Sequence, residues 1–247
     1  DAAMQLGLIK IIEGKIVYTG DGSYGYGLLR DETSGRAGAR SLGAVNYMDT
    51  KIMPNHNELG QRIMIFFYPQ LTYDDTSNDL QFLDEISNDK LVEMALSFDK
   101  GYSSSEAMAL IPKGISKTWL WVNHEFDETQ LYTHHYNENL ELKKKIPNTK
   151  RADSAFGYSV INTDGTFAEN PAERFIGAIS SGTKRKSYWQ DTFQMLNQNI
   201  SGDDNKLSVS DLVINGMVVT GTAENLKQLQ GLPFIKASSL GIVVDKY

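Results

Sequence analysis

Apolar and polar positions in the second part of the chain repeat the order strand, helix, strand. In the first copy, the apolar run Leu91–Phe98 predicts a strand. A serine cluster then opens a short helical pattern at Ser104–Ile111, with Glu106 in its first turn. The run Ile115–Asn123, which ends in the letters WLWVN, predicts the second strand of this unit.

The second copy follows later in the chain. Its predicted strands are Leu212–Thr220 and Ser239–Asp245. Its predicted helix is Ala223–Leu229, with Thr222 as the N-cap and Gly231 as the stop. Two such units predict an α+β fold, in which one mixed sheet carries all four strands and both helices cover one of its faces. Parallel strands of one unit are then joined by right-handed crossovers.

The remaining patterns divide the chain into three parts. Residues 1–72 are predicted to be β-rich, because the runs LGLIKIIEGKIVYTG and RIMIFFYPQL are dominated by β-branched and aromatic residues. Residues 73–89 form an acidic connector, and residues 90–247 form the α+β domain. Within this domain, SAFGYSVIN predicts a further strand, whereas NPAERFIGAISSG and KSYWQDTFQMLNQNIS predict helices.

Composition and charge exclude several kinds of partner and several kinds of chemistry. The formal net charge of −7 makes the body of the protein repel phosphate backbones and anionic lipid surfaces, so we expect no nucleic-acid partner. The absence of cysteine excludes disulfides, thiolate metal sites and cysteine nucleophiles. No apolar run approaches the roughly 20 residues that span a bilayer. The first letters, DAAMQ, lack an initiator methionine, and we expect them to follow a longer N-terminal segment.

The glycine-rich letters GDGSYGYG, Gly20–Gly27, are expected to form a hairpin turn. They lack the Lys-Ser/Thr ending of a P-loop, and their glycine spacing differs from the dinucleotide fingerprint. A calcium loop is also not predicted. The candidate oxygen ligands are Asn162, Asp164, Glu169 and Glu173, but Val160 and Pro171 stand where an EF-hand needs ligands. We expect a turn that leads into a helix with an acidic first turn.

A polar loop around three of the four histidines invites a metal-site interpretation. Its candidate residues are His124, Glu125, Asp127, Glu128, His134, His135 and Glu138. A hydrolytic zinc site on a helix has two histidines four residues apart with a glutamate between them, and that pattern is missing. No G-x-S-x-G motif is present for a serine nucleophile. We therefore predict no catalytic, cofactor-binding or metal-binding residue.

Trp119 and Trp121 alternate with Leu120 and Val122, so both indoles project from one face of their strand. This face could stack on a ligand or fill the core. We predict the core, because large aromatic side chains dominate buried area.

Residues 126–153 are polar and poorly periodic, which predicts a surface excursion that is mobile and partly helical. Its basic residues are Lys143, Lys144, Lys145, Lys150 and Arg151. On a body of net charge −7, such a cluster is either a solvated loop, which is the expected role, or a contact for an acidic partner or an anionic wall polymer.

Two phrases of the sequence, ALSFDKGYS (Ala95–Ser103) and WLWVN (Trp119–Asn123), resemble the sigma factor regulator C-terminal family. This family is the outer portion of membrane-anchored anti-sigma factors of Firmicutes. FGYSVIN, AERFIGAI and ASSLGIVVD extend the resemblance over roughly Leu91–Tyr247. In such proteins a cytoplasmic segment holds an extracytoplasmic-function sigma factor, and one transmembrane helix leads to the outer domain. The resemblance implies regulation and assigns no active-site residue.

From this resemblance we expect a non-enzymatic sensing domain on the extracellular face of the cell membrane, within a single-pass membrane protein. The expected partners are an envelope ligand or protein, and a sigma factor that binds a cytoplasmic segment outside this chain. The membrane is reached only through a transmembrane helix that also lies outside it, and no cofactor is expected. Two alternatives stay open: a cell-envelope hydrolase that uses the His124–Glu138 loop, and a structural envelope-interaction module.

Overall fold

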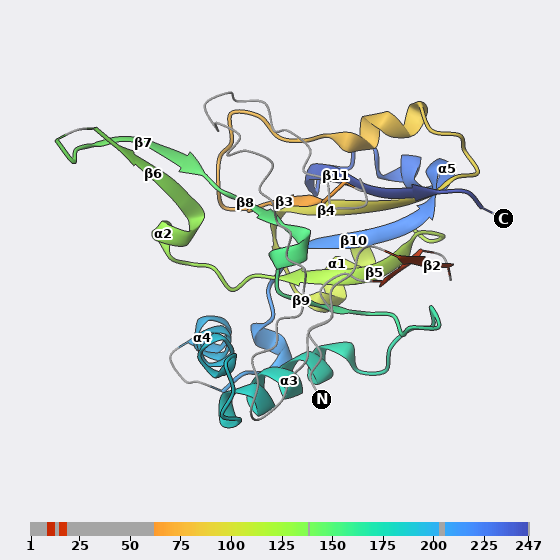
Figure 1. Ribbon diagram of the computed structural model, residues 1–247. Helices are drawn as coiled ribbons and strands as arrows, with labels where there is room; N and C mark the ends of the chain where they lie inside the picture. The colour runs from red at the N-terminus through yellow and green to blue at the C-terminus, as the bar shows by residue number, and fades with distance from the viewer. Residues whose placement is uncertain (1–8, 13–14, 19–61, 138, 203–205, 247) are drawn as a thin grey trace.

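A computed structural model describes residues 62–137, 139–202 and 206–246 in full (Figure 1). It also describes the backbone of two short strands, β1 (Ile9–Ile12) and β2 (Lys15–Tyr18), which pair as an antiparallel hairpin. The predicted turn at Gly20–Gly27 and much of the predicted β-rich part lie outside the described residues. The division of the chain at residues 73–89 stays a prediction.

A five-stranded antiparallel sheet forms the centre of the fold, in the order β11-β4-β10-β5-β9. Its strands are β4 (Leu91–Tyr102), β5 (Ser116–Val122), β9 (Gly157–Ser159), β10 (Ile214–Thr222) and β11 (Ile235–Val244). The four strands of the two predicted units therefore lie in one sheet, as expected. The further strand predicted within SAFGYSVIN is the edge strand β9.

Each strand-helix-strand unit is split by a strand of the other unit. The first unit is β4, α1 (Ser104–Leu110) and β5, and β10 lies between its two strands. The second unit is β10, α5 (Ala223–Leu226) and β11, and β4 lies between its strands. The strands of one unit are parallel to each other, but every neighbouring pair is antiparallel.

The expectation of a mixed sheet is therefore wrong. Each helical crossover leaves a gap one strand wide, and the strand that fills it runs in the opposite direction. This is the split β-α-β arrangement of ferredoxin-like folds. Apolar spacing along the chain predicts the strands of a unit, but it does not predict which strand lies between them.

The first helix begins within the predicted serine cluster, at Ser103, and the second begins at the predicted Thr222 cap. The Ser103 hydroxyl accepts a hydrogen bond from the Glu106 backbone N–H (3.3 Å), and the Glu106 carboxylate accepts one from the Ser103 N–H (2.9 Å). At the second helix, the Thr222 hydroxyl accepts a hydrogen bond from the Asn225 N–H (3.2 Å). A 3-10 turn, η5 (Lys227–Leu229), follows α5, and Gly231 ends this segment with a φ of +73°.

The remaining elements flank the sheet. The two helices predicted after residue 169 are present as α3 (Pro171–Lys184) and α4 (Gln190–Ser201). The excursion before them contains α2 (Glu128–Leu131), β6 (Tyr132–Tyr136), β7 (Leu142–Pro147), β8 (Thr149–Arg151) and η2 (Ala152–Ser154). Outside it lie β3 (Ile65–Phe67), η1 (Asp79–Asp84) and η4 (Val209–Asp211). The polar excursion is thus partly helical, as expected, but its strands β6, β7 and β8 were not predicted.

One face of the sheet packs against the helices. Met94, Leu96 and Phe98 alternate along β4 toward this face, where they are fully buried. Ala107 of α1 and Leu226 of α5 belong to the same apolar cluster, so both predicted helices cover one face. α3 and α4 extend the cluster beyond the β9 edge of the sheet (Figure 1).

The other face packs against residues 62–71. Phe66 stacks on Trp121 with ring centroids 4.9 Å apart and on Trp119 at 6.0 Å. Trp121 is buried, which confirms its predicted core role, whereas Trp119 is partly buried and packs against the same apolar cluster. The backbone of β3 is held by serines of the sheet. The Phe67 N–H donates to the Ser97 hydroxyl (2.9 Å), and the Ile65 N–H donates to the Ser239 hydroxyl (3.1 Å). Both faces of the sheet are therefore covered.

Candidate functional site

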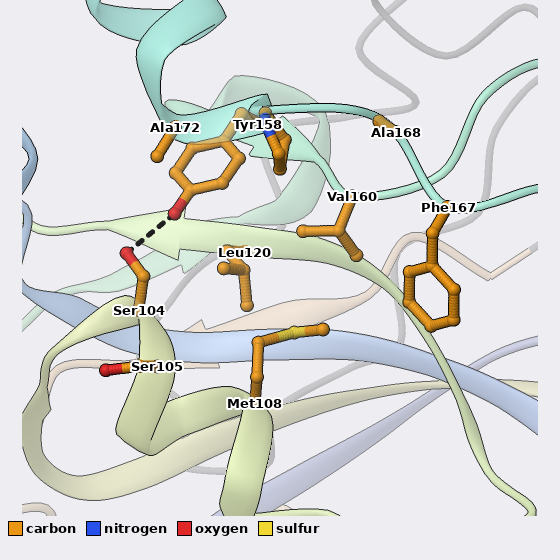
Figure 2. A pocket seen from close by; sticks show the side chains of 10 residues that line it. Ser104, Ser105, Met108, Leu120, Tyr158, Val160, Phe167, Ala168 and Ala172 are labelled. Carbon is orange, nitrogen blue, oxygen red and sulfur yellow. Dashed lines mark hydrogen bonds between the residues drawn. The ribbon is translucent and has the colours of Figure 1, made fainter.

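An apolar groove lies between α1 and the segment that leads from β9 into α3 (Figure 2). It has a volume of about 300 Å³. We call it the α1 groove, and its apolar walls are formed by Met108, Leu120, Val160, Phe167, Ala168 and Ala172. Phe167 is 68% exposed, so the groove is open to solvent beside its ring. Its size suits a small apolar group.

The cap of α1 positions one wall of the groove. Because Ser103 begins the helix, Ser104 and Met108 stand one turn apart on the same side of it. The Ser104 hydroxyl lies 2.7 Å from the Tyr158 hydroxyl of β9, and this hydrogen bond joins the two walls. Burial of the Tyr158 ring is the main cause that raises the pKa of its phenol.

A turn before α3 positions the opposite wall. The Asp164 carboxylate accepts hydrogen bonds from the backbone N–H (2.9 Å) and the hydroxyl (2.6 Å) of Thr166, and these bonds lower the pKa of Asp164. α3 then begins at Pro171, with Glu173 in its first turn. The residues weighed as calcium ligands thus form the predicted turn and acidic helix start.

The polar groups that line the α1 groove are the hydroxyls of Ser104, Ser105 and Tyr158. None of its lining residues carries a carboxylate, an imidazole or a cation. Such walls can accept an apolar group and offer it one or two hydrogen bonds. They have no acid-base pair for hydrolysis and no ligand set for a metal ion.

His124, the first histidine of the hydrolase alternative, is a buried structural residue. Its side chain is 3% exposed, with Nδ1 3.3 Å from the Val122 carbonyl oxygen and Nε2 3.4 Å from the Glu125 carboxylate. Burial, followed by the positive charge of Lys150, lowers its pKa from 6.5 to about 4, against the opposing hydrogen bond to Val122. The ring also packs edge-on against Phe156. A neutral, enclosed imidazole is poorly placed to serve as a general base for a solvent-borne substrate.

His134 and His135 lie on the exposed strand β6, opposite Lys145 and Lys144 of β7. In the described parts of the chain, no three His, Cys, Asp or Glu side chains are grouped so that they could hold a metal ion. Glu138, the end of the proposed hydrolase loop, lies outside the described residues. The structure therefore does not assemble the three histidines into one metal site.

The basic cluster is divided by ion pairs that the sequence did not predict. Lys150 contacts the Glu125 carboxylate at 2.7 Å, and Lys145 is paired with Glu128. Lys143 and Lys144 form no ion pair with any described residue. Folding of β6 against β7, together with the α2 turn, brings opposite charges to two of the lysines, so only part of the cluster remains available to a partner.

Sequence reasoning did not find the α1 groove. Its walls come from residues some fifty positions apart, such as Ser104 and Tyr158, which are 54 residues apart in the sequence. The serine cluster was interpreted only as a helix cap. Ser104 is the first residue of α1, and Tyr158 lies on the edge strand β9. That these two residues line one groove can be recognised only when the order of the strands in the sheet is known.

A comparison with models of protein families gives a match. The model of the family described as Sigma factor regulator C-terminal matches residues 83–242, which is well over half of the chain. The matched range contains β4, α1, β5, β9 and β10, and it includes every residue that lines the α1 groove. No curated protein and no solved structure is significantly similar to the chain. Among the described residues, no helix has the length and apolarity needed to cross a membrane.

Proposed function

The chain belongs to the Sigma factor regulator C-terminal family, and from this premise we propose that it is the outer, signal-receiving domain of a membrane-anchored anti-sigma factor. The family is one of regulatory domains, and the role proposed here is regulation without catalysis. In this proposal the domain lies on the extracellular face of the membrane. A transmembrane helix and a cytoplasmic segment, both outside this chain, link it to an extracytoplasmic-function sigma factor. The family match is the observation that carries the proposal.

The α1 groove is the site proposed to receive the signal. Its apolar walls and three hydroxyl groups suit an apolar group of an envelope ligand, and its opening beside Phe167 gives access from solvent. A ligand regulates only if it binds two states of the protein with different affinity. In the state described here, the Ser104–Tyr158 hydrogen bond joins the walls. A ligand that enters the groove favours a second state in which these walls are farther apart.

α1 is well placed to pass such a movement into the fold. It connects β4 to β5, and these strands flank β10 in the centre of the sheet. Ala107 on its inner side is fully buried, so the helix cannot shift without repacking of the apolar cluster beneath it. The groove and the core are thus coupled through the helix.

The test uses the full-length regulator and its sigma factor in cells that carry a sigma-dependent reporter gene. Ala168→Phe fills the groove with an aromatic ring. We expect this variant to change the induction of the reporter by envelope stress several-fold, at unchanged protein level. Gly177→Phe is the matched control, because a Cβ at this exposed position of α3 meets no atom within 4 Å. It adds the same ring to an open surface, and we expect it to behave as wild type.

Two outcomes contradict the proposal at different levels. If removal of the whole outer domain leaves reporter activity unchanged with and without stress, the regulatory role is wrong. If that removal has an effect but Ala168→Phe and Gly177→Phe behave alike, the domain regulates through another surface. The second result rejects only the groove.

A further inference from the structure

The β6–β7 hairpin, Tyr132–Pro147, leaves the body of the protein as a two-stranded ribbon. β6 and β7 pair with each other in antiparallel register and form a sheet of their own. In Figure 1 the ribbon extends away from the five-stranded sheet, so that its closing turn stands clear of the helices. No residue of either strand is buried.

Large apolar side chains gather at the closed end of this ribbon. Leu140 is 83% exposed, Tyr136 58% and Leu142 45%. We call these three residues the hairpin tip. Hairpin turns are ordinarily polar and use glycine, asparagine or aspartate at their tightest positions. Exposed apolar groups collected at the end of a projecting ribbon indicate a contact surface.

Leu140 also has a backbone conformation that leucine avoids. Its φ is +61°, in the left-handed region that glycine occupies with least strain. The side-chain oxygen of Asn137 stabilises the turn by accepting hydrogen bonds from the N–H groups of Asn139 (3.1 Å) and Glu141 (2.8 Å). A large apolar side chain is thus held outward at a position where the backbone favours glycine, which points to a function for that side chain.

Positive charge lies directly beside the tip. Lys143 and Lys144 follow Leu142 on β7, are exposed, and have no ion-pair partner among the described residues, whereas Lys145 is paired with Glu128. The hairpin contains three lysines and two glutamates in a chain whose net charge is −7. Its small positive surplus is therefore opposite in sign to the charge of the body.

We propose that the β6–β7 hairpin docks on an anionic lipid bilayer. The hairpin tip enters the interface between headgroups and acyl chains, and Lys143 and Lys144 contact the headgroup phosphates. Aliphatic and aromatic side chains beside lysines suit this interface, because the apolar groups leave water while the ammonium groups reach the phosphates. The acidic body is repelled by the same surface, so the contact is confined to the hairpin.

The hairpin tip favours a bilayer over a soluble polyanion as the partner. A wall polymer presents negative charge but no apolar interior, so it gives Leu140 and Leu142 nothing to bind. The small positive surplus of the hairpin also holds such a polymer weakly, since salt screens exposed charges beyond about 8 Å at physiological ionic strength. Apolar and basic groups together match a membrane surface.

The first test places a reporter at the tip of the chain 1–247. Because the chain has no cysteine, Leu140→Cys creates a single site for an environment-sensitive fluorophore. We expect its emission to shift to shorter wavelength when vesicles of phosphatidylglycerol and phosphatidylcholine are added, and to stay unchanged with phosphatidylcholine alone. The same fluorophore at Val209→Cys, an exposed apolar position on η4, is the control and should not respond to either vesicle.

The second test separates the apolar and charged contributions by flotation of unlabelled protein with the same vesicles. Leu140→Ser combined with Leu142→Ser should weaken binding at least about tenfold. Lys143→Gln combined with Lys144→Gln should weaken it about fivefold for each lysine at low salt. The matched control is Lys113→Gln combined with Lys186→Gln, which changes the charge equally at exposed positions elsewhere and should keep most of the binding.

Each remaining outcome decides against the proposal. Equal flotation of wild type and the double serine variant overturns it. So does binding to soluble polyglycerol phosphate that the double glutamine variant loses and the double serine variant keeps, because this pattern assigns the hairpin to a polymer. Circular dichroism checks the fold of each variant, and Leu140→Asn replaces the double serine variant if that protein unfolds. No sigma factor takes part, so failure here leaves the proposed function intact.

Discussion

The central sheet and the β6–β7 hairpin are both antiparallel, yet the sheet is covered on both faces and the hairpin on neither. The first eight residues of β4 are all buried, whereas no residue of β6 or β7 is. A strand pair without cover contributes little to stability. Packing in the core therefore determines which side chains fit in the sheet. The side chains of the hairpin are free of this constraint and can instead serve contact with a partner.

The largest expected effect comes from Phe66, which covers the second face of the sheet. Its side chain is fully buried and stacks on Trp119 and Trp121. Phe66→Ala should lower the free energy of unfolding by about 3–5 kcal/mol, because it removes apolar contacts and leaves a cavity. Tyr136→Ala, the hairpin counterpart, should change it by less than about 0.5 kcal/mol. Urea unfolding measures both, and similar losses would remove the contrast between the two regions.

The next effect is the dependence of the free energy of unfolding on pH that His124 causes in the body of the protein. Its pKa is about 4 in the folded protein and near 6.5 in the unfolded chain. Between these pH values the unfolded chain binds a proton that the folded protein does not. The free energy of unfolding therefore falls as the pH drops from 6.5 to 4, by about 3 kcal/mol in total.

His124→Gln removes this titration. We expect its free energy of unfolding to decline less steeply over the same pH window than that of wild type. His135→Gln, on the exposed hairpin, serves as the matched control. Parallel curves for wild type and His124→Gln would show that this histidine is not kept neutral by the fold.

A smaller loss is expected at the serines that hold β3 on the sheet. Ser97 is fully buried and accepts the Phe67 N–H, so Ser97→Ala leaves that buried donor without a partner. We expect a loss of about 1–3 kcal/mol in the free energy of unfolding. Ser154→Ala, at an exposed position of η2, is the control for removal of a hydroxyl. If both variants unfold at the same urea concentration, the bond to β3 adds nothing.

These contrasts also explain which parts of the fold were predictable from the sequence. Strands and caps depend on neighbours in the chain, so the apolar runs, the serine cluster before α1 and the Thr222 cap indicated them correctly. The mixed sheet was the wrong inference, because the order of strands depends on contacts between distant segments. The strands of the excursion were missed because its exposed hairpin has no buried face, and without one no apolar alternation marks β6 and β7.

In the candidate site, too, features that depend on neighbours in the chain were predictable from the sequence, and contacts between distant segments were not. Alternation placed Trp119 and Trp121 on one face of their strand, and their size assigned them to the core; this proved correct for Trp121, whereas Trp119 is partly buried beside it. The α1 groove needs Ser104 and Tyr158 side by side, a contact that follows from β9 pairing with β5 at the edge of the sheet. The pairing of Lys150 with Glu125 and of Lys145 with Glu128 likewise depends on the folded excursion, so the sequence overstated the available positive charge.

The smallest expected effect is a gain in the stability of the β6–β7 hairpin from a substitution by glycine. Glycine ordinarily destabilises a strand. Leu140 has a φ of +61°, and glycine adopts this conformation without the penalty of about 1 kcal/mol that a Cβ brings. Leu140→Gly should therefore stabilise the closing turn. The amide of Asn137, which donates to the Glu141 carbonyl (3.0 Å), should exchange its hydrogen more slowly by up to about fivefold.

Leu142→Gly is the matched control, since Leu142 lies in the extended strand β7, where glycine is destabilising. It should make the same amide exchange faster. The two variants remove the same side chain type two residues apart and are expected to act in opposite directions. Faster exchange in both would mean that Leu140 stabilises the turn through its side chain. Leu140 would then have a structural role in the turn. Its exposed, outward position would no longer support the proposed contact with a lipid bilayer.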